Sequence, residues 1–202
     1  MGDQENKPPN EEEDTYAANV HHVLQPKYDP YFNSNTKIIQ DLLDDEKWYY
    51  RQPAYISPFN ENGIKMRREL FCWLREIVLH RCIDLEVLAS AGQYVDRFVA
   101  FGTTTSATYQ LVGAAAVFIA SKIKEVAPLS SADIVAYTAH SITHKALIDA
   151  EVSLGNSFDW DLSIVTPLEF FKPLIALLPY DAETKEEINL EATKVFLKIF
   201  PC

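Results

Sequence analysis

The sequence contains few cysteines and few glycines. Its three cysteines, Cys72, Cys82 and Cys202, include no C-x-x-C pair. Their odd number and wide spacing argue against a disulfide framework or a zinc site, so we expect a reducing compartment. The six glycines form no glycine-rich phosphate loop, which argues against a nucleotide-binding enzyme of that kind.

Basic residues and long apolar runs are also scarce. The chain has 18 Lys and Arg residues against 29 Asp and Glu residues, which gives a net charge of −11. This acidic balance argues against nucleic acid or an anionic membrane as the main partner. The apolar run over residues 111–120 is shorter than the roughly 18 residues of a membrane span. The N-terminus has no apolar core behind a basic stretch, so we expect no secretory signal.

The first thirty residues differ in composition from the rest of the chain. They are polar and acidic, with Pro8, Pro9 and an acidic run over residues 11–14. Such a segment cannot bury enough apolar surface to offset the entropy lost on ordering. We therefore expect residues 1–30 to be a disordered acidic tail, with a solubilising or a regulatory role.

The remaining sequence predicts an all-α protein. No run of alternating residues demands a sheet, and the Thr166-Pro167 dipeptide is a clear helix start because threonine caps helices and proline suits the first turn. Apolar periodicity and breakers predict helices over residues 36–50, 64–80, 84–100, 105–125, 130–138, 143–157, 167–178 and 182–200.

One predicted helix is apolar on every side. In the stretch "QLVGAAAVFIASKIKE", small residues such as Gly113 and Ala120 allow neighbouring backbones to approach, while larger ones such as Phe118 fill the gaps. We therefore expect this helix to form the centre of a helical bundle. Lys122 near its C-terminus is explained by the helix dipole alone.

Arg67 falls inside the apolar arc of its helix, between Leu74 and Val78, at about 100° per residue. A buried guanidinium without a carboxylate partner is strongly destabilising. Asp96 lies at the edge of the apolar arc of the next helix, so we predict an Arg67–Asp96 ion pair. The alternative is that the Arg67 side chain extends to water.

Two further features each allow two interpretations. The stripe of Met66, Leu70 and Trp73 is either plain core or a partly exposed apolar surface where a partner docks. His140 and His144 have the four-residue spacing of two metal ligands on one helical turn. They lack a third ligand of evident spacing and lie where a loop enters a helix, which favours a surface or capping role.

Four stretches together resemble a cyclin box, and D-type cyclins most of all. They are "MRRELFCWLREIV", "QYVDRFVAF", "YQLVGAAAVFIASKIKEVAPLS" and "ALIDAEVSLGNSFDWDLSIVTPLEFF". The resemblance extends over about residues 36–178. It implies a five-helix bundle around a central apolar helix over residues 31–162, with an N-terminal helix. Residues 163–202 would be an incomplete second cyclin-fold repeat.

The resemblance also implies roles for individual residues. The five positions that define the box are filled by Arg67, Asp96, Leu111, Lys122 and Glu151. The kinase-binding residues would be Lys122, Glu151, Ile119, Ile123, Trp160 and Leu162. The patch that docks substrates and inhibitors would be Met66, Leu70, Trp73, Glu76 and Gln110.

The implied function is regulatory rather than catalytic. A D-type-like cyclin would bind and activate a cyclin-dependent serine/threonine kinase that controls G1 progression, with pocket-protein substrates and kinase inhibitors as further partners. It would need no cofactor or metal, bind neither nucleic acid nor membrane, and occupy nucleus and cytoplasm. The alternative is a cyclin-fold adaptor, or an inactive short variant, that binds partners without activating a kinase.

The sequence departs from the D-type pattern in three places. Glu69 occupies a position of the docking patch that is usually aliphatic, and residues 1–35 contain no cysteine and hence no L-x-C-x-E motif. Cyclins normally have a second five-helix repeat, and this sequence contains about two helices of it and no phosphodegron tail of the D-type kind. Either the chain is incomplete, or it is a short variant whose last helices expose apolar side chains such as Val195, Phe196 and Ile199.

Overall fold

The computed structural model describes residues 36–49, 61–101, 104–105 and 107–200, which form eight α-helices and no strand within these ranges. The all-α prediction is confirmed, while the predicted acidic tail lies outside the described residues. The helices are α3 (Thr36–Tyr49), α4 (Glu61–Arg81), α5 (Leu85–Val99), α6 (Tyr109–Lys124), α7 (Ser131–Tyr137), α8 (His144–Ser157), α9 (Pro167–Ala176) and α10 (Ala182–Ile199).

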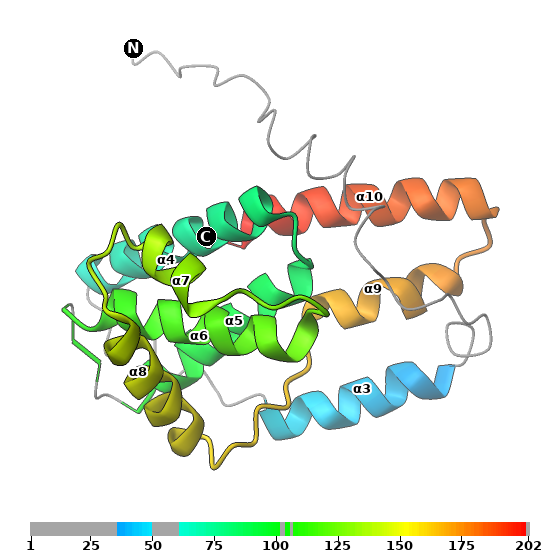
Figure 1. Ribbon diagram of the computed structural model, residues 1–202. Coiled ribbons are helices and arrows are strands. Elements are labelled where there is room, and N and C mark those ends of the chain that lie inside the picture. Colours follow the sequence, from blue (N-terminus) through cyan, green and yellow to red (C-terminus); the bar gives the residue numbers. More distant parts are fainter. Residues whose placement is uncertain (1–35, 50–60, 102–103, 106, 201–202) are drawn as a thin grey trace.

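Helix α6 lies at the centre of the bundle, surrounded by α4, α5, α7 and α8 (Figure 1). Every residue from Val112 to Ser121 is buried. A Cβ atom on Gly113 would lie only 2.5 Å from a methyl carbon of Leu70 on α4. The small residues of α6 therefore let its neighbours pack closely, and the predicted central helix is confirmed.

Several helices begin near their predicted first residues, where polar side chains form hydrogen bonds with the backbone of the first turn. Ser130 and Asp133 form a capping box at the start of α7, which satisfies two backbone N–H groups that the helix cannot pair itself. Pro167 occupies the first turn of α9, and the preceding Thr166 N–H donates to the Glu169 carboxylate over 3.4 Å. These local signals were sufficient to locate both helices.

The start of α6 differs from its prediction, because the helix begins at Tyr109 rather than at residue 105. The Thr108 hydroxyl accepts a hydrogen bond from the Thr105 N–H over 3.0 Å and lies 3.1 Å from the Thr105 carbonyl oxygen. Hydrogen bonds of this kind offer the backbone an alternative to the helical pattern. The threonine-rich stretch therefore stays outside the helix.

Helix α10 runs back from the far end of α9 towards α4, which places the C-terminal end of α10 beside α4 (Figure 1). The Phe200 ring stacks on Phe71 of α4 with centroids 4.9 Å apart. A Cβ atom on Gly92 of α5 would lie 2.7 Å from the Phe200 ring. The Arg75 guanidinium also donates to the Leu197 carbonyl over 3.1 Å. The last turn of α10 is thus part of the α4–α5 packing.

This packing corrects one prediction about the last helix. Phe196 is only 6% exposed, because it faces the core beside Phe200. The prediction that Phe196 is exposed is therefore wrong. Val195 and Ile199 are 53% and 60% exposed, as predicted.

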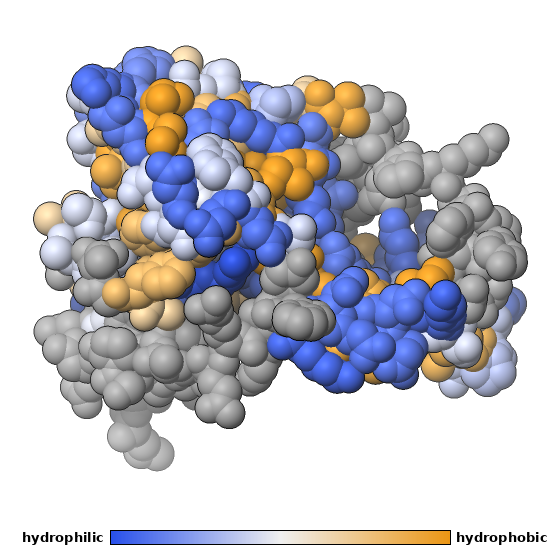
Figure 2. Space-filling view, turned by 90° about the horizontal axis from the view of Figure 1, so that it is seen from below, coloured by the Kyte–Doolittle hydropathy of each residue, from blue (hydrophilic) through white to orange (hydrophobic). Residues whose placement is uncertain are grey.

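The outward face of α3 is predominantly hydrophilic when the molecule is seen from below (Figure 2). Its other side packs against α9, so α3 has the pattern of an amphipathic surface helix. Within the described ranges, no helix combines the length and the apolar character needed to cross a bilayer.

Candidate functional site

The Arg67–Asp96 pair joins α4 to α5. The guanidinium donates two hydrogen bonds to the carboxylate, over 2.9 and 2.8 Å, and also lies 3.9 Å from the centroid of the Phe71 ring. The two charged side chains are 22% and 18% exposed. The pair predicted from the helical wheel is therefore present. Its geometry is bidentate, which favours arginine over lysine.

A second pair, Lys122 with Glu151, joins the C-terminal end of α6 to the middle of α8. The Lys122 Nζ lies 2.6 Å from Glu151 Oε1 and 3.8 Å from the centroid of the Phe118 ring. The Lys122 side chain is 41% exposed, whereas that of Glu151 is 14% exposed. Two contacts therefore hold the ammonium group at the surface, where its remaining N–H donors are accessible to a partner.

Exposed apolar side chains surround this pair. Ile123 follows Lys122 on α6 and is 48% exposed, and Trp160 beyond the end of α8 is 53% exposed. On α8, Ile148 and Val152 are 42% and 44% exposed. Ile148 is a helix-surface neighbour of both Glu151 and Val152, because it lies three and four positions before them. We call the group of Lys122, Glu151, Ile123, Ile148, Val152 and Trp160 the α6–α8 face.

The sequence-based prediction named both charged residues of this face, Lys122 and Glu151, but only some of its exposed apolar residues. It did not include Ile148 and Val152. These two residues are four positions apart with Glu151 between them, and this spacing is a signal that could have identified them. Conversely, Ile119 is 2% exposed and Leu162 packs against the core. Both therefore lie beneath the face and support it.

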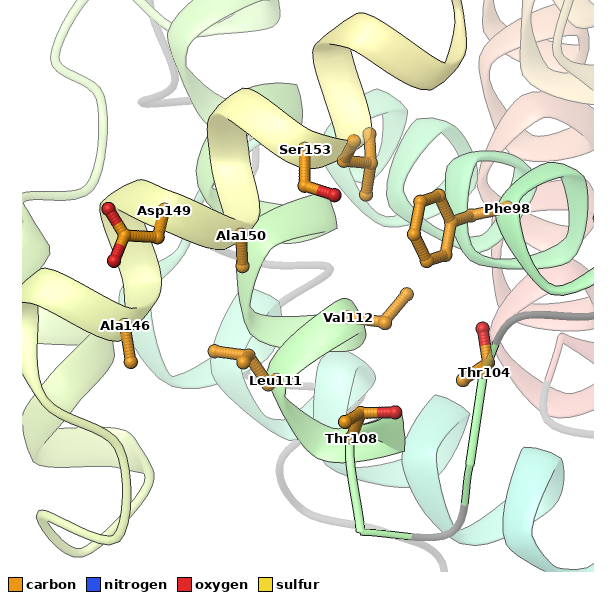
Figure 3. A pocket seen from close by; sticks show the side chains of 10 residues that line it. Phe98, Thr104, Thr108, Leu111, Val112, Ala146, Asp149, Ala150 and Ser153 are labelled. Atoms are coloured by element: carbon orange, nitrogen blue, oxygen red, sulfur yellow. The ribbon is translucent and has the colours of Figure 1, made fainter.

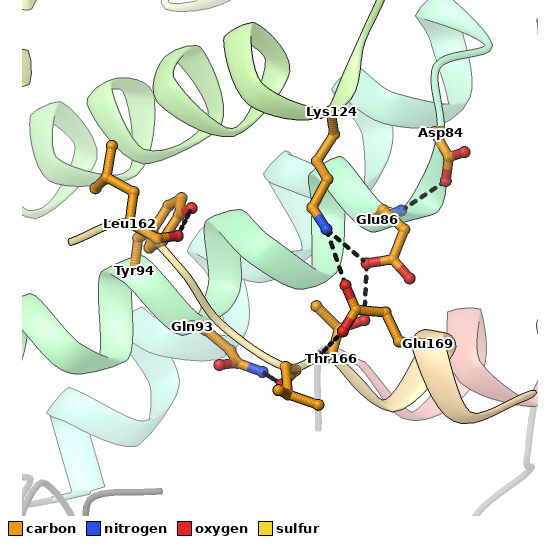
Figure 4. A network of polar contacts seen from close by, with 9 residues as sticks. Asp84, Glu86, Gln93, Tyr94, Lys124, Leu162, Thr166 and Glu169 are labelled. Atoms are coloured by element: carbon orange, nitrogen blue, oxygen red, sulfur yellow. Dashed lines mark hydrogen bonds and ion pairs between the residues drawn. The ribbon is translucent and has the colours of Figure 1, made fainter. Parts of the chain in front are cut away.

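A polar network fixes the C-terminal end of α6 to α5 and α9 (Figure 4). The Lys124 Nζ lies 3.0 Å from the Glu169 carboxylate and 3.7 Å from that of Glu86. The Thr166 hydroxyl donates to Glu86 over 2.7 Å. Burial raises the pKa of Glu86 to about 7, against the opposing effects of the Thr166 hydrogen bond and the Lys124 charge. Sequence reasoning did not identify this network.

Helix α5 also holds the segment that leads from α8 to α9 (Figure 4). The Tyr94 hydroxyl donates to the Leu162 carbonyl over 2.7 Å, and the Gln93 side-chain amide donates to the Val165 carbonyl over 2.8 Å. Burial raises the pKa of Tyr94 to about 12, so its hydroxyl remains a donor at neutral pH. These bonds fix the chain that follows Trp160.

The predicted docking stripe on α4 is only partly accessible. Leu70 is 6% exposed because its methyl groups pack on Gly113 of α6. Met66 and Trp73 are half-buried, and the Trp73 indole N–H donates to the Tyr137 carbonyl over 3.3 Å. The predicted partial exposure thus holds for the outer two residues of the stripe.

The polar residues around this stripe are exposed. Gln110 accepts a hydrogen bond from the Ser141 hydroxyl over 3.4 Å, and Glu76 lies on the outer face of α4. Glu69, the departure from the D-type pattern, has a 65% exposed side chain that lies 3.7 Å from Lys65. Two carboxylates, those of Glu69 and Glu76, therefore lie beside the stripe on α4.

A pocket of about 500 Å³ lies on the other flank of α8 (Figure 3). Asp149 and Ser153 line it, and each is two positions from Glu151, which places them on nearly the opposite side of the helix. Its walls are mostly apolar and come from Phe98, Leu111, Val112, Ala146, Ala150 and Leu154. The pocket is thus separate from the α6–α8 face.

The two histidines do not share a helical turn. His140 lies in the turn between α7 and α8, whereas His144 is the first residue of α8 and its Nδ1 lies 3.2 Å from the Ser131 hydroxyl. Across the part of the chain that the structure describes, no three His, Cys, Asp or Glu side chains gather as metal ligands.

Comparison with known proteins identifies the family of this bundle. The family model described as "Cyclin, N-terminal domain" matches residues 37–163, which is more than half of the chain. The chain belongs to the cyclin family. The helices that carry both ion pairs lie within the matched residues.

Several relatives are named as D-type cyclins, in agreement with the predicted resemblance. The chain is 31% identical to G1/S-specific cyclin-D1 of Danio rerio over 78% of its own length and 55% of the relative. It is 32% identical to G1/S-specific cyclin-D2 of Rattus norvegicus, over 76% of its length and 53% of the relative. The chain thus spans about half the length of the relatives it matches.

A solved structure shows the same fold. The viral cyclin from herpesvirus saimiri superposes with a TM-score of 0.72 at 22% identity, covering 81% of this chain and 72% of the viral chain. At this identity the similarity concerns the fold alone.

Proposed function

We propose that this protein is a D-type-like cyclin that binds and activates a cyclin-dependent serine/threonine kinase controlling G1 progression. One observation supports this most strongly, namely the Lys122–Glu151 pair at 2.6 Å between the C-terminal end of α6 and the middle of α8. It lies among exposed apolar side chains on helices that the family model covers. A half-exposed ion pair within an apolar surface is suited to contact a protein rather than a small molecule.

The proposed mechanism is a shift of a conformational equilibrium in the kinase. Protein kinases are active when a strand lysine pairs with a glutamate on the mobile C-helix and the activation loop is ordered. The α6–α8 face packs against the C-helix of the kinase, where Lys122 and Glu151 form polar contacts and Ile123 and Trp160 form apolar ones. Because the face fits the active arrangement better than the inactive one, binding raises the active population.

The remaining parts of the proposal concern the other surfaces and the location. Residues 31–162 act as the kinase-binding fold, and residues 163–202 act as a partial second repeat. The α4 stripe with Glu76 and Gln110 docks pocket-protein substrates and kinase inhibitors. The complex operates in the nucleus and the cytoplasm, and the protein itself performs no chemistry.

The binding part of the proposal predicts a specific defect in two variants. Lys122→Ala or Glu151→Ala removes one member of a pair that is partly withdrawn from water. We expect the Kd for the kinase to rise by about tenfold, equal to about 1.4 kcal/mol. Purified wild type and variants are titrated against a panel of purified cyclin-dependent kinases, and the unfolding midpoint of each variant is measured alongside.

Lys65→Ala is the matched control. Lys65 is also a lysine paired with a carboxylate, Glu69 at 3.7 Å, but its side chain is 75% exposed and lies on α4, which carries no residue of the α6–α8 face. We expect its Kd to equal that of the wild type within about twofold, because exposed pairs of this kind contribute little. Equal kinase affinity for wild type, Lys122→Ala and Glu151→Ala would refute the proposed contact.

A further inference from the structure

Helix α8 ends in a turn that holds an exposed tryptophan. The Trp160 N–H donates to the Gly155 carbonyl over 2.8 Å, and the Asp159 N–H donates to the Asn156 carbonyl over 3.1 Å. This is the Schellman pattern of hydrogen bonds, in which a glycine usually occupies the left-handed position. Here Asp159 and Trp160 have φ angles of 52° and 58°. Two consecutive residues with side chains therefore adopt a backbone conformation that costs free energy.

The side chain of Trp160 has two further contacts with the end of α8. Its indole N–H donates to the Asn156 side-chain oxygen over 2.9 Å. Its six-membered ring lies on Gly155, so closely that a Cβ atom there would be 2.8 Å from two ring carbons. One face and one edge of the indole are thus occupied, yet the residue is 53% exposed. These two contacts orient the exposed part of the ring.

The end of α7 provides an internal comparison. Ala139 and His140 have φ angles of 49° and 60°, and the same two hydrogen bonds close that turn. The turn alone is therefore a feature that this fold uses twice. The end of α8 differs because its turn carries a large aromatic ring, that of Trp160, which packs against Gly155.

The charges around the indole indicate what it contacts. Asp159 and Asp161 flank Trp160 in the chain and both are exposed. On α8, the exposed Ile148 and Val152 lead along the same face towards Gly155, on which the ring rests. The surface is therefore an apolar stripe that ends in an indole between two carboxylates.

We propose that Trp160 is a preorganised anchor, which inserts into an apolar recess bordered by lysine or arginine on the partner kinase. Gly155 and Asn156 act as positioning residues for it. Tryptophan is one of the three side chains that are enriched at the energetic centre of interfaces. Fixing it before binding avoids the loss of side-chain entropy on association, and a neighbouring cation is attracted by both the carboxylates and the ring. This inference rests on the proposed kinase-binding function.

The first test compares Kd values for the kinase that the wild-type protein binds. Trp160→Ala removes the anchor and is expected to raise the Kd by about 30-fold, within the range found for interface tryptophans. Gly155→Ala displaces the ring and Asn156→Ala releases its edge, and each is expected to raise the Kd by about three- to tenfold. Ser157→Ala, an exposed position at the end of the same helix, is the control with unchanged Kd.

The second test measures the orientation of Trp160 without any partner. Replacing Trp48 and Trp73 by phenylalanine leaves Trp160 as the single tryptophan, whose fluorescence anisotropy decay reports ring motion. We expect slow decay in this background, and a fast component after Gly155→Ala or Asn156→Ala. A fast component before these substitutions would overturn the preorganisation.

The third test concerns the charge of the partner. Replacing Asp159 and Asp161 together by asparagine is expected to raise the Kd at low salt and to reduce its dependence on salt, because two attractive charges are removed. An unchanged salt dependence would overturn the basic border of the recess.

The outcomes separate this inference from the proposed function. If wild type binds a kinase and Trp160→Ala binds it equally well, the anchor is refuted while the kinase-binding function stands. If the wild type binds no kinase of the panel, both fail together. A binding defect in Trp160→Ala, with slow ring motion in the free protein, supports both.

Discussion

Arg67 illustrates how far a single residue can be interpreted from sequence. Its position inside an apolar arc required a carboxylate from another helix, and Asp96 provides it with two hydrogen bonds. The prediction succeeded because burying an unpaired guanidinium is so unfavourable that few arrangements remain. Its stacking over Phe71 at 3.9 Å had no such signal in the sequence.

Arg67→Ala is expected to lower the free energy of unfolding by about 2–4 kcal/mol. It leaves the partly buried Asp96 carboxylate unpaired, and it removes the guanidinium from the Phe71 ring. Urea denaturation followed by circular dichroism measures the change. Arg68→Ala, one position along and exposed, should differ from wild type by less than about 0.5 kcal/mol. Equal stability of the two variants would show that the pair does not stabilise the bundle.

At the scale of elements, ion pairs connect the C-terminal end of α6 to three other helices. Lys124 connects it to Glu86 of α5 and Glu169 of α9, while Lys122, two residues earlier, connects it to α8. Changes in the packing of α9 therefore act on the same turn that carries Lys122 and Ile123. Glu86 is the member of this network whose protonation changes near neutral pH, because burial raises its pKa to about 7.

Glu86→Gln is expected to remove a pH dependence of stability. The pKa of Glu86 is about 7 in the folded protein and near 4.5 without burial. The folded state thus holds this proton more tightly, so the resulting stabilisation is complete below pH 4.5 and is lost as pH rises through 7. From pH 5 to pH 8, the wild type should lose about 2 kcal/mol of unfolding free energy relative to Glu86→Gln.

Urea titrations at pH 5, 6, 7 and 8 measure this difference. Glu183→Gln on the exposed first turn of α10 serves as the control for losing one carboxylate. The interpretation of Glu86 would be wrong if the wild type and Glu86→Gln lost stability in parallel over this range.

Element boundaries show why local signals sometimes suffice and sometimes do not. The starts of α7 and α9 were predictable because Ser130 and Thr166-Pro167 act within their own first turns. The start of α6 was not, because hydrogen bonds between Thr105 and Thr108 compete with the helix. The network around Lys124 could not be predicted either, since Glu86 and Glu169 are brought together only by tertiary packing.

For the molecule as a whole, the apolar pattern predicted the bundle and the central α6, but not the return of α10. Nothing near Phe200 in the sequence indicates that its ring stacks on Phe71 and lies over Gly92. The same limit applies to the α6–α8 face. Its charges followed from a family resemblance, whereas the exposure of Ile148 and Val152 and the burial of Ile119 depend on how α8 crosses α6.

Kinase activation tests the central claim most directly. The protein is co-expressed with each of a panel of cyclin-dependent kinases, the complexes are purified, and phosphate transfer to a pocket-protein fragment is measured against the kinase alone. For at least one kinase, we predict a rate increase of about tenfold or more, which is lost when Lys122 and Glu151 are both replaced by alanine. A purified complex whose rate equals that of the kinase alone would contradict the claim and would instead fit an adaptor that binds without activating.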